Sequence, residues 1–212
     1  MHAKVLIPAV IVGLLAAIIA ISFVVSIPTE HEIELKEYNL DFSYSDLESM
    51  QTRLAAKDIY MSSLTSVTDR TIDHYCMFFD ENDKKQSVTY CATTALLDLS
   101  GNTIGNLNMG GTSESAIMAV ALVDSKFLDS KQAHVEFIFK TMIDSLVCDC
   151  WEEQKPGGFS SVSEWIDLAA KKYEQSGQIT LKSTIEGIDN KQVILEITNT
   201  GSSYIWTLIV LK

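Results

Sequence analysis

The sequence lacks every short catalytic signature that residue order alone can reveal. It contains no Gly-x-Ser-x-Gly elbow, no Gly-x-Gly-x-x-Gly or Gly-Lys-Ser/Thr phosphate loop, and no Cys-x-x-Cys or His-x-x-x-His pair. Its few histidines have no evident triad partners in sequence: His2, His31, His74 and His134. A triad is recognised by geometry and not by order, so these absences lower the odds of an enzyme without closing the question. We expect a protein with no catalytic activity of its own.

Basic residues are scarce. The chain has 28 acidic side chains, all beyond residue 29, against 16 basic ones, and setting Lys4 aside leaves a formal charge near −13 on the rest. Affinity for nucleic acid comes mainly from Lys and Arg neutralising phosphates, so this charge excludes nucleic acid as a partner. It suits cationic partners or divalent ions, but a solvated acidic surface is the simpler interpretation.

Only one hydrophobic run is long enough to cross a bilayer. Residues Val5 to Val25 contain no charge, and a helix of about 20 apolar residues spans the hydrocarbon core. The run exceeds the usual length of a signal-peptide core, so it predicts a signal-anchor helix at 5–26. The alternative is a cleaved signal peptide, because Val24 and Ser26 are small enough for a cleavage site before Ile27.

The charges beside this run predict the topology. Lys4 precedes the run and acidic residues follow it closely, so the positive-inside rule places 1–4 in the cytoplasm. Residues 27–44 form a connector, and 45–212 form one domain outside the cytoplasm, of a size that buries a substantial core. We expect a single-pass protein of the cell membrane.

The cysteines all lie in the exterior part: Cys76, Cys91, Cys148 and Cys150. Outside the reducing cytosol an even number of cysteines predicts disulfide bonds. Three connectivities exist, and those joining the Cys76 and Cys91 region to the Cys148 and Cys150 region are favoured, because a Cys148–Cys150 bridge closes a very small ring. A strained ring would be easily reduced, which leaves a redox role for that pair as an alternative.

A metal or ligand site is a further alternative. His134, Cys148 and Cys150 carry imidazole and thiolate groups, which suit copper or zinc. Their spacing matches no established metal motif, so we expect cystines, an ordinary surface histidine, and no cofactor or metal.

The first half of the domain predicts a helix followed by strands. A capping box at Ser45-Asp46-Leu47-Glu48 opens a helix, and apolar residues at helical spacing predict one long helix or a slightly broken pair of helices to about Tyr75. Pairing of this helix with a copy of itself leaves a homodimer as an alternative. The charged segment 80–85 lacks the spacing of a calcium loop. Strands are predicted at 87–99 and 103–107, joined by a turn at Asp98 to Asn102, with the rest of 101–111 as loop.

The second half predicts helices and then a sheet. Helices are expected at 116–127, from Asp129 or Ser130 to Leu146, and from the capping box at Ser161 to Gly177. Two strands follow, with turns at Asp189-Asn190 and Asn199-Thr200-Gly201. The last strand, Tyr204 to Leu211, is apolar on both faces, which predicts a central strand covered by helices on at least one side and by further protein on the other. The fold class is α+β with a mostly antiparallel sheet packed against several helices.

The order of an anchor, a long helix, a strand, an Asp98-to-Gly101 turn and a returning strand is similar in architecture to extracytoplasmic sensor domains of the PAS or Cache type. That resemblance implies a small-ligand site above the membrane. Three functions compete: a membrane-tethered module that binds a partner protein or serves as an accessory subunit, a small-ligand or metal binder, and a hydrolase or thiol oxidoreductase. The first is the main prediction, because no residue pattern supports a reaction.

Overall fold

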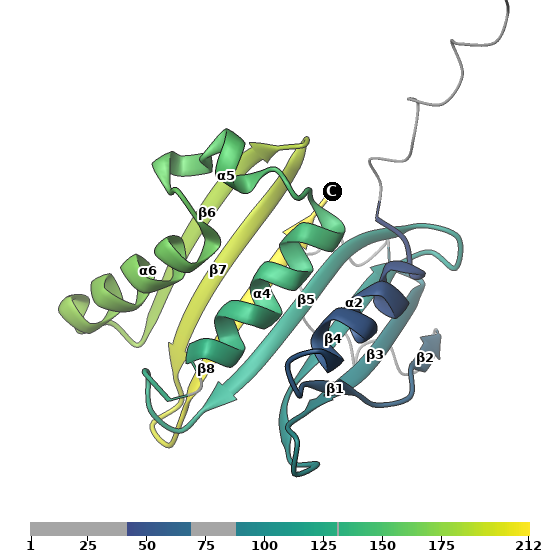
Figure 1. Ribbon diagram of the computed structural model, residues 1–212, viewed down its shortest axis with the longest axis horizontal. Coiled ribbons are helices and arrows are strands. Elements are labelled where there is room, and N and C mark those ends of the chain that lie inside the picture. Colours follow the sequence, from purple (N-terminus) through teal and green to yellow (C-terminus); the bar gives the residue numbers. More distant parts are fainter. Residues whose placement is uncertain (1–41, 69–87, 131) are drawn as a thin grey trace, which may run out of the picture. The chain divides into compact units, whose positions relative to one another are not determined.

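The computed structural model describes residues 42–68, 88–130 and 132–212 (Figure 1). They belong to one compact unit, Leu40–Lys212. The expected anchor at 5–26, the charged segment 80–85, His74 and Cys76 lie outside the described residues. No described helix combines the length and the apolarity needed to cross a bilayer.

The unit is built on one eight-stranded sheet in the order β1-β3-β4-β5-β8-β7-β6, with β2 also pairing β3. Every described pairing is antiparallel. The strands are β1 (Tyr60–Met61), β2 (Thr65–Thr68), β3 (Tyr90–Leu97), β4 (Thr103–Gly111), β5 (Ala116–Ser125), β6 (Thr180–Ile188), β7 (Lys191–Asn199) and β8 (Tyr204–Leu211). The predicted class, α+β with a mostly antiparallel sheet, is confirmed.

Helices α2, α4 and α6 lie on the same face of the sheet (Figure 1). Their bounds are α2 (Asp46–Ala55), α4 (Gln132–Leu146) and α6 (Val162–Ser176), with the short α5 (Trp151–Gln154) and the 3-10 turn η3 (Pro156–Gly158) between the last two. The main core fills the space between these helices and the sheet.

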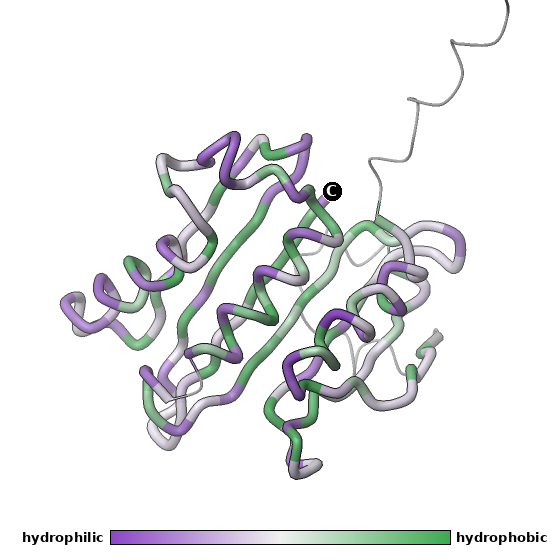
Figure 2. The backbone as a smooth tube through the Cα atoms, in the orientation of Figure 1, coloured by the Kyte–Doolittle hydropathy of each residue, from purple (hydrophilic) through white to green (hydrophobic). Residues whose placement is uncertain are grey.

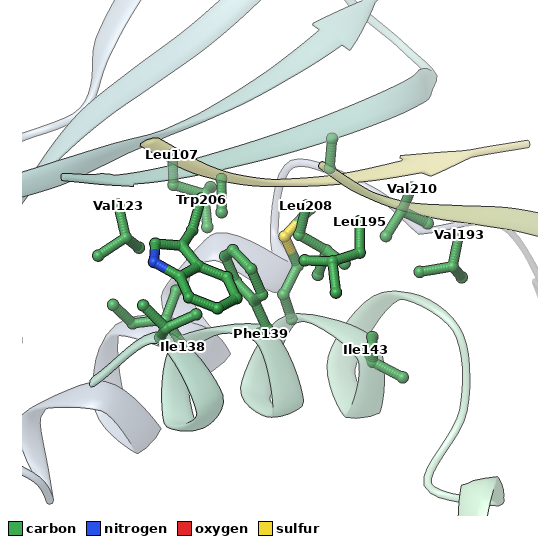
Figure 3. Close-up of a cluster of buried hydrophobic side chains, with 14 of the residues drawn as sticks. Leu107, Val123, Ile138, Phe139, Ile143, Val193, Leu195, Trp206, Leu208 and Val210 are labelled. Atoms are coloured by element: carbon green, nitrogen blue, oxygen red, sulfur yellow. The ribbon is translucent and has the colours of Figure 1, made fainter. Parts of the chain in front are cut away.

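The core is set by the alternation of side chains along each strand. Val123, Trp206 and Ile197 lie side by side on β5, β8 and β7 and point toward α4. Two residues further along these strands, a second row points the same way: Ala121, Leu208 and Leu195. Figure 3 shows Val123, Trp206, Leu208 and Leu195 on the side of the sheet that faces Ile138 and Phe139 of α4. The indole N–H of Trp206 donates to Ser125 Oγ at 3.2 Å, so this fully buried residue leaves no polar atom unpaired.

A second, smaller apolar cluster lies on the opposite face of the sheet. Its buried members are Val67, Val88, Cys91, Met118 and Val120, and Ile117, Leu122, Ile209 and Leu211 pack at its margin while staying partly exposed. Hydrophobic residues accordingly run along both faces of the central strands, and Figure 2 shows β5, β7 and β8 as strongly hydrophobic.

The C-terminal elements match their sequence predictions. Ser161 accepts the Glu164 N–H at 3.1 Å at the start of α6, and Gly177 takes the left-handed conformation at its end. The turns at Asp189-Asn190 and Asn199-Thr200-Gly201 join β6, β7 and β8, and the predicted strand at Tyr204 to Leu211 is central. The helix predicted from Asp129 or Ser130 is α4.

The long helix or broken pair of helices predicted from Ser45 to about Tyr75 is wrong from Ala56 to Thr68, where β1 and β2 lie, and residues 69–75 are outside the described part of the chain. Asp58 adopts the left-handed conformation at φ 59°, and the Ile59 N–H donates to the Leu54 carbonyl. This is a Schellman ending with aspartate in the place that glycine usually occupies, so the end of the helix carries no glycine signal. The cap also differs, because Asp46 accepts the Ser43 N–H at 2.7 Å while the Ser45 side chain makes no cap bond.

The helix predicted at 116–127 is also wrong, because this segment is strand β5. It pairs with β4 on one side and β8 on the other, so both of its faces carry apolar residues. A short continuous apolar run fits a buried helix and a central strand equally well. Likewise β4 continues to Gly111 through residues predicted as loop. Glycine is required within it, since a Cβ at Gly105 would lie 2.0 Å from the Leu122 carbonyl oxygen.

Replacing the cap of α6 should destabilise the domain. We expect Ser161→Ala to lower the free energy of unfolding by about 1 kcal/mol, because the Glu164 N–H loses its acceptor. Urea denaturation of the variant measures this. The control is Ser113→Ala, at an exposed serine with no hydrogen bond to the described residues, and an equal loss in both variants would contradict the capping role.

Tyr44 should make stability depend on alkaline pH. Its hydroxyl donates to the Thr112 carbonyl at 2.8 Å, and burial, aided by the nearby Tyr90, raises the pKa of Tyr44 to about 12. The unfolded chain ionises near the ordinary value of 10.0, so this contribution is complete below pH 10 and is lost as pH rises toward about 12. Urea denaturation across this pH range should show a smaller decline in the free energy of unfolding for Tyr44→Phe than for the unsubstituted protein. Parallel declines in the two proteins would argue against the pKa shift.

Candidate functional site

The most distinctive surface of the domain is the part of the sheet opposite the helices on β5 and β8. Leu122, Ile205, Ile209 and Leu211 lie on this side and are partly exposed; we call these four residues the bare face. Register fixes their side, since Leu122 pairs with Thr207 and Asp124 with Ile205, whereas the alternating Val123 and Trp206 face α4. No described helix covers the bare face.

A cavity of about 400 Å³ lies at one end of the bare face. Ile117, Met118 and Leu211 provide its apolar wall, while polar residues from the β6–β7 hairpin line the other side: Glu186, Asn190, Lys191 and Gln192. The polar groups are largely paired with one another. Gln192 Nε2 donates to Glu186 Oε1 at 2.9 Å, and Lys191 Nζ donates to Asp189 Oδ2 at 2.8 Å. The cavity therefore offers an apolar wall and few unpaired charges.

A second cavity, of about 570 Å³, lies where β5 ends and β8 begins. It is lined by Thr103, Asp124, Lys126, Phe127, Ser130, Ser202 and Ser203. The Phe127 side chain is 58% exposed, with the Lys126 ammonium 5.5 Å from its ring centroid. Hydroxyl groups dominate this cavity, and it holds no cluster of ionisable side chains suited to catalysis.

The cysteine pairing differs from the favoured connectivity. Cys148 and Cys150 are joined to each other, with their Cα atoms 5.2 Å apart, in the turn between α4 and α5. The turn brings the two Cα atoms into the usual range for a bridge, which a count of ring residues overlooks. Cys91 is also disulfide-bonded, and its partner lies outside the described residues. No described cysteine is a free thiol.

His134 is not brought near the cysteine pair. His134 lies in the first turn of α4, whereas Cys148 lies beyond the last helical residue, Leu146, and the helix between His134 and Leu146 rises by about 18 Å. No group of three or more His, Cys, Asp or Glu side chains in the described part of the chain could hold a metal ion. These three residues therefore do not form one site.

Two carboxylates that could serve as acid or base have structural partners. The Asp144 carboxylate forms ion pairs with Arg53 of α2 at 2.6 Å and with Lys140 at 3.0 Å. The pair with Arg53 links α2 to α4. Asp98 Oδ1 accepts the N–H groups of Ser100 and Asn102 and shapes the β3–β4 turn. Neither points to a reaction.

Some buried nitrogens have no hydrogen-bond partner: Asn108 Nδ2, His134 Nδ1 and Trp151 Nε1. Asn108 lies in β4 opposite Val120, and Thr93 donates to its Oδ1 at 2.6 Å. Trp151 follows Cys150 and packs against Trp165 with ring centroids 5.5 Å apart. They belong to separate elements and do not converge on a common site.

Comparison of the chain with protein-family models, with curated proteins and with solved structures finds no match. The resemblance to PAS or Cache domains therefore stays a prediction. Sequence reasoning missed the β5 half of the bare face because it predicted a helix there. The two-sided apolarity of Tyr204 to Leu211 was the signal that pointed to the β8 half.

The Cys148–Cys150 bridge can be tested by peptide mapping without reduction. Cleavage with trypsin should release one peptide containing both cysteines, two hydrogens lighter than its reduced form and unlinked to any other peptide. The double variant Cys148→Ser/Cys150→Ser should lose this mass difference and cost no more than about 2 kcal/mol of stability, because the ring is short. A peptide joined to Cys76 or Cys91 would refute the pairing.

Proposed function

We propose that this chain is a membrane-anchored module outside the cytoplasm that binds a partner protein through the bare face and has no catalytic activity of its own. The single observation that carries the proposal is the row of partly exposed apolar side chains on β5 and β8, on the side of the sheet opposite α2, α4 and α6. Neighbouring apolar side chains that stay partly accessible to solvent are typical of an interaction site.

The position of the bare face supports a partner protein. β8 is central, with neighbours on both sides, and its helix-facing residues Trp206, Leu208 and Val210 are fully buried. Ile205, Ile209 and Leu211 alternate with them and stay partly exposed. Strands buried on both faces are normally apolar on both, so the sequence of β8 suits a strand that a partner covers.

The cavity beside Leu211 supports a contact in which a side chain of the partner protein is buried. Interfaces concentrate their binding energy in a few residues that fill pockets near an apolar centre. An apolar side chain of the partner would contact Ile117 and Met118 in this cavity, while Glu186 and Gln192 form a polar rim. The anchor predicted at 5–26 would keep the module close to membrane proteins.

The partner can be captured by site-specific photocrosslinking in native membranes. The photoreactive residue p-benzoyl-phenylalanine is placed at Ile205 or Leu122, and at Leu99 as the control, since Leu99 is 69% exposed but lies in the β3–β4 turn. We expect one discrete crosslinked protein from the two bare-face positions and none from Leu99. Equal products from all three positions would contradict the proposal.

A charged substitution then tests whether the contact is apolar. Ile205→Glu should weaken association with the captured protein by at least about tenfold, because an unpaired carboxylate would be buried, whereas Leu99→Glu should leave it unchanged. Thermal unfolding shows whether both variants fold. Protease treatment of intact cells tests the topology separately: the domain should be cleaved from outside, and protection would refute the exterior location.

A small-ligand function is the second candidate, and the cavity of about 400 Å³ favours it because ligand sites commonly have 300–1,000 Å³. Met118→Trp would fill this cavity. If a bound metabolite recovered from the native protein disappears in Met118→Trp while photocrosslinking at Ile205 finds no protein, the ligand function replaces the partner function.

A further inference from the structure

The disulfide between Cys148 and Cys150 is more accessible than the disulfide at Cys91. It joins two cysteines separated by a single residue, in the turn between α4 and α5. Both cysteines pack against the margin of the main core and stay partly exposed, whereas Cys91 is disulfide-bonded and fully buried. Thiol–disulfide exchange requires a thiolate to reach a sulfur atom. An attacking thiol therefore reaches the Cys148–Cys150 bridge first.

Contacts other than the bridge hold this turn in place. The Cys148 N–H donates to the Ile143 carbonyl at 3.1 Å at the end of α4. Trp151, directly after the bridge, is buried and packs against Trp165 of α6 with ring centroids 5.5 Å apart. Neither contact involves a sulfur atom. The turn therefore has the support to keep its shape when the bridge is open.

The fold protects this bridge only weakly against reduction. A bridge stabilises the fold by the same free energy by which the fold stabilises the bridge, because both belong to one thermodynamic cycle. Closing so short a loop removes little entropy from the unfolded chain. Folding therefore favours the disulfide over two thiols by no more than about thirtyfold, which is equivalent to the limit expected for the stability loss of Cys148→Ser/Cys150→Ser. An exposed bridge with little protection fits a labile disulfide better than a structural one.

We propose that the Cys148–Cys150 pair is a redox site that exchanges its disulfide with a dithiol of another protein, while the bridge at Cys91 stays closed. The exchange is stoichiometric, with one dithiol oxidised for each bridge reduced. The proposal does not depend on the bare face, which lies on the opposite side of the sheet from the helices, so either site can fail alone.

The exchange balances without any further reactant. A thiolate of the partner dithiol attacks one Sγ of the pair, the bond between the two Sγ atoms breaks, and the other cysteine leaves as a thiolate that takes up a proton. The second thiolate of the partner then attacks the partner's own sulfur in the mixed disulfide and releases the remaining cysteine, which is protonated in turn. The partner dithiol loses two electrons and two protons and becomes a disulfide, and the pair gains them and becomes two thiols.

A redox titration of the full chain in detergent micelles tests the difference between the two bridges. The chain is equilibrated with graded ratios of reduced to oxidised dithiothreitol, quenched with acid, alkylated and analysed by peptide mass. Cys148 and Cys150 should be half reduced at a ratio at least about tenfold lower than Cys91, a difference of about 30 mV. A difference smaller than tenfold, or loss of the fold when only this pair is reduced, overturns the proposal.

Trapping in native membranes tests for the partner dithiol. Cys148→Ser and Cys150→Ser each leave one thiol of the pair, which should form a discrete mixed disulfide that acid quenching and alkylation preserve and reductant removes. The control is Ser113→Cys in the Cys148→Ser/Cys150→Ser background, which places a thiol at an exposed position of the β4–β5 turn and should give no product.

The trapped protein, purified and reduced, should then reduce the unsubstituted chain at Cys148 and Cys150 and leave Cys91 closed. No product from either single variant, the same product from the Ser113→Cys control, or no reduction by the purified partner overturns the proposal. Thermal unfolding shows whether the variants fold, and if they do not, the titration of the unsubstituted chain decides.

Discussion

The pairing of β5 with β8 is the interaction on which the architecture depends. Each belongs to a meander of three consecutive strands, β3–β4–β5 and β6–β7–β8, and their eight aligned residue pairs, from Met118–Leu211 to Ser125–Tyr204, join the two meanders into one sheet. Helix α4 lies across this junction and contacts both strands. Residues far apart in sequence must meet here, so the junction is the least local contact of the sheet.

This pairing also determines which residues are available for binding. A shift of β8 by one residue against β5 would turn Trp206 away from α4 and bring Ile205 into the core. The fit of Trp206 against Phe139, with its indole bonded to Ser125, favours the observed register (Figure 3). The bare face is therefore a direct consequence of core packing: the residues that fill the core leave their neighbours on the opposite side.

The sequence predicted elements whose signals are local. The α6 cap at Ser161 and the turns at Asp189-Asn190 and Asn199-Thr200-Gly201 depend on a few adjacent residues, and the alternation around Val193 to Ile197 predicts one buried face. β5 could not be predicted because its apolar residues serve two faces, and only its neighbours β4 and β8 distinguish a strand from a helix. The early end of α2 was hidden because Asp58 takes the conformation expected of glycine.

The residues of the candidate site were likewise predictable only where a short stretch of sequence was sufficient. The β8 residues of the bare face followed from the two-sided apolarity of Tyr204 to Leu211, whereas Leu122 joined them through strand pairing alone. The Cys148–Cys150 bridge depends on the turn that follows α4, and ring size is a poor guide to it. Residue types indicated which groups could react or bind, but distances between elements decided which of them share a site.

The bare face and the outer strand β6 are connected through the side-chain alternation of the sheet. Thr180, Lys182 and Thr184 of β6 carry their side chains on the side opposite α6, which is also the side of Ile209. Between them, on β7, this side carries Ile194, Glu196 and Thr198, so it changes from apolar at β8 to polar at β6. The apolar part of this side therefore suits the buried centre of a contact, and the polar part suits its solvated rim.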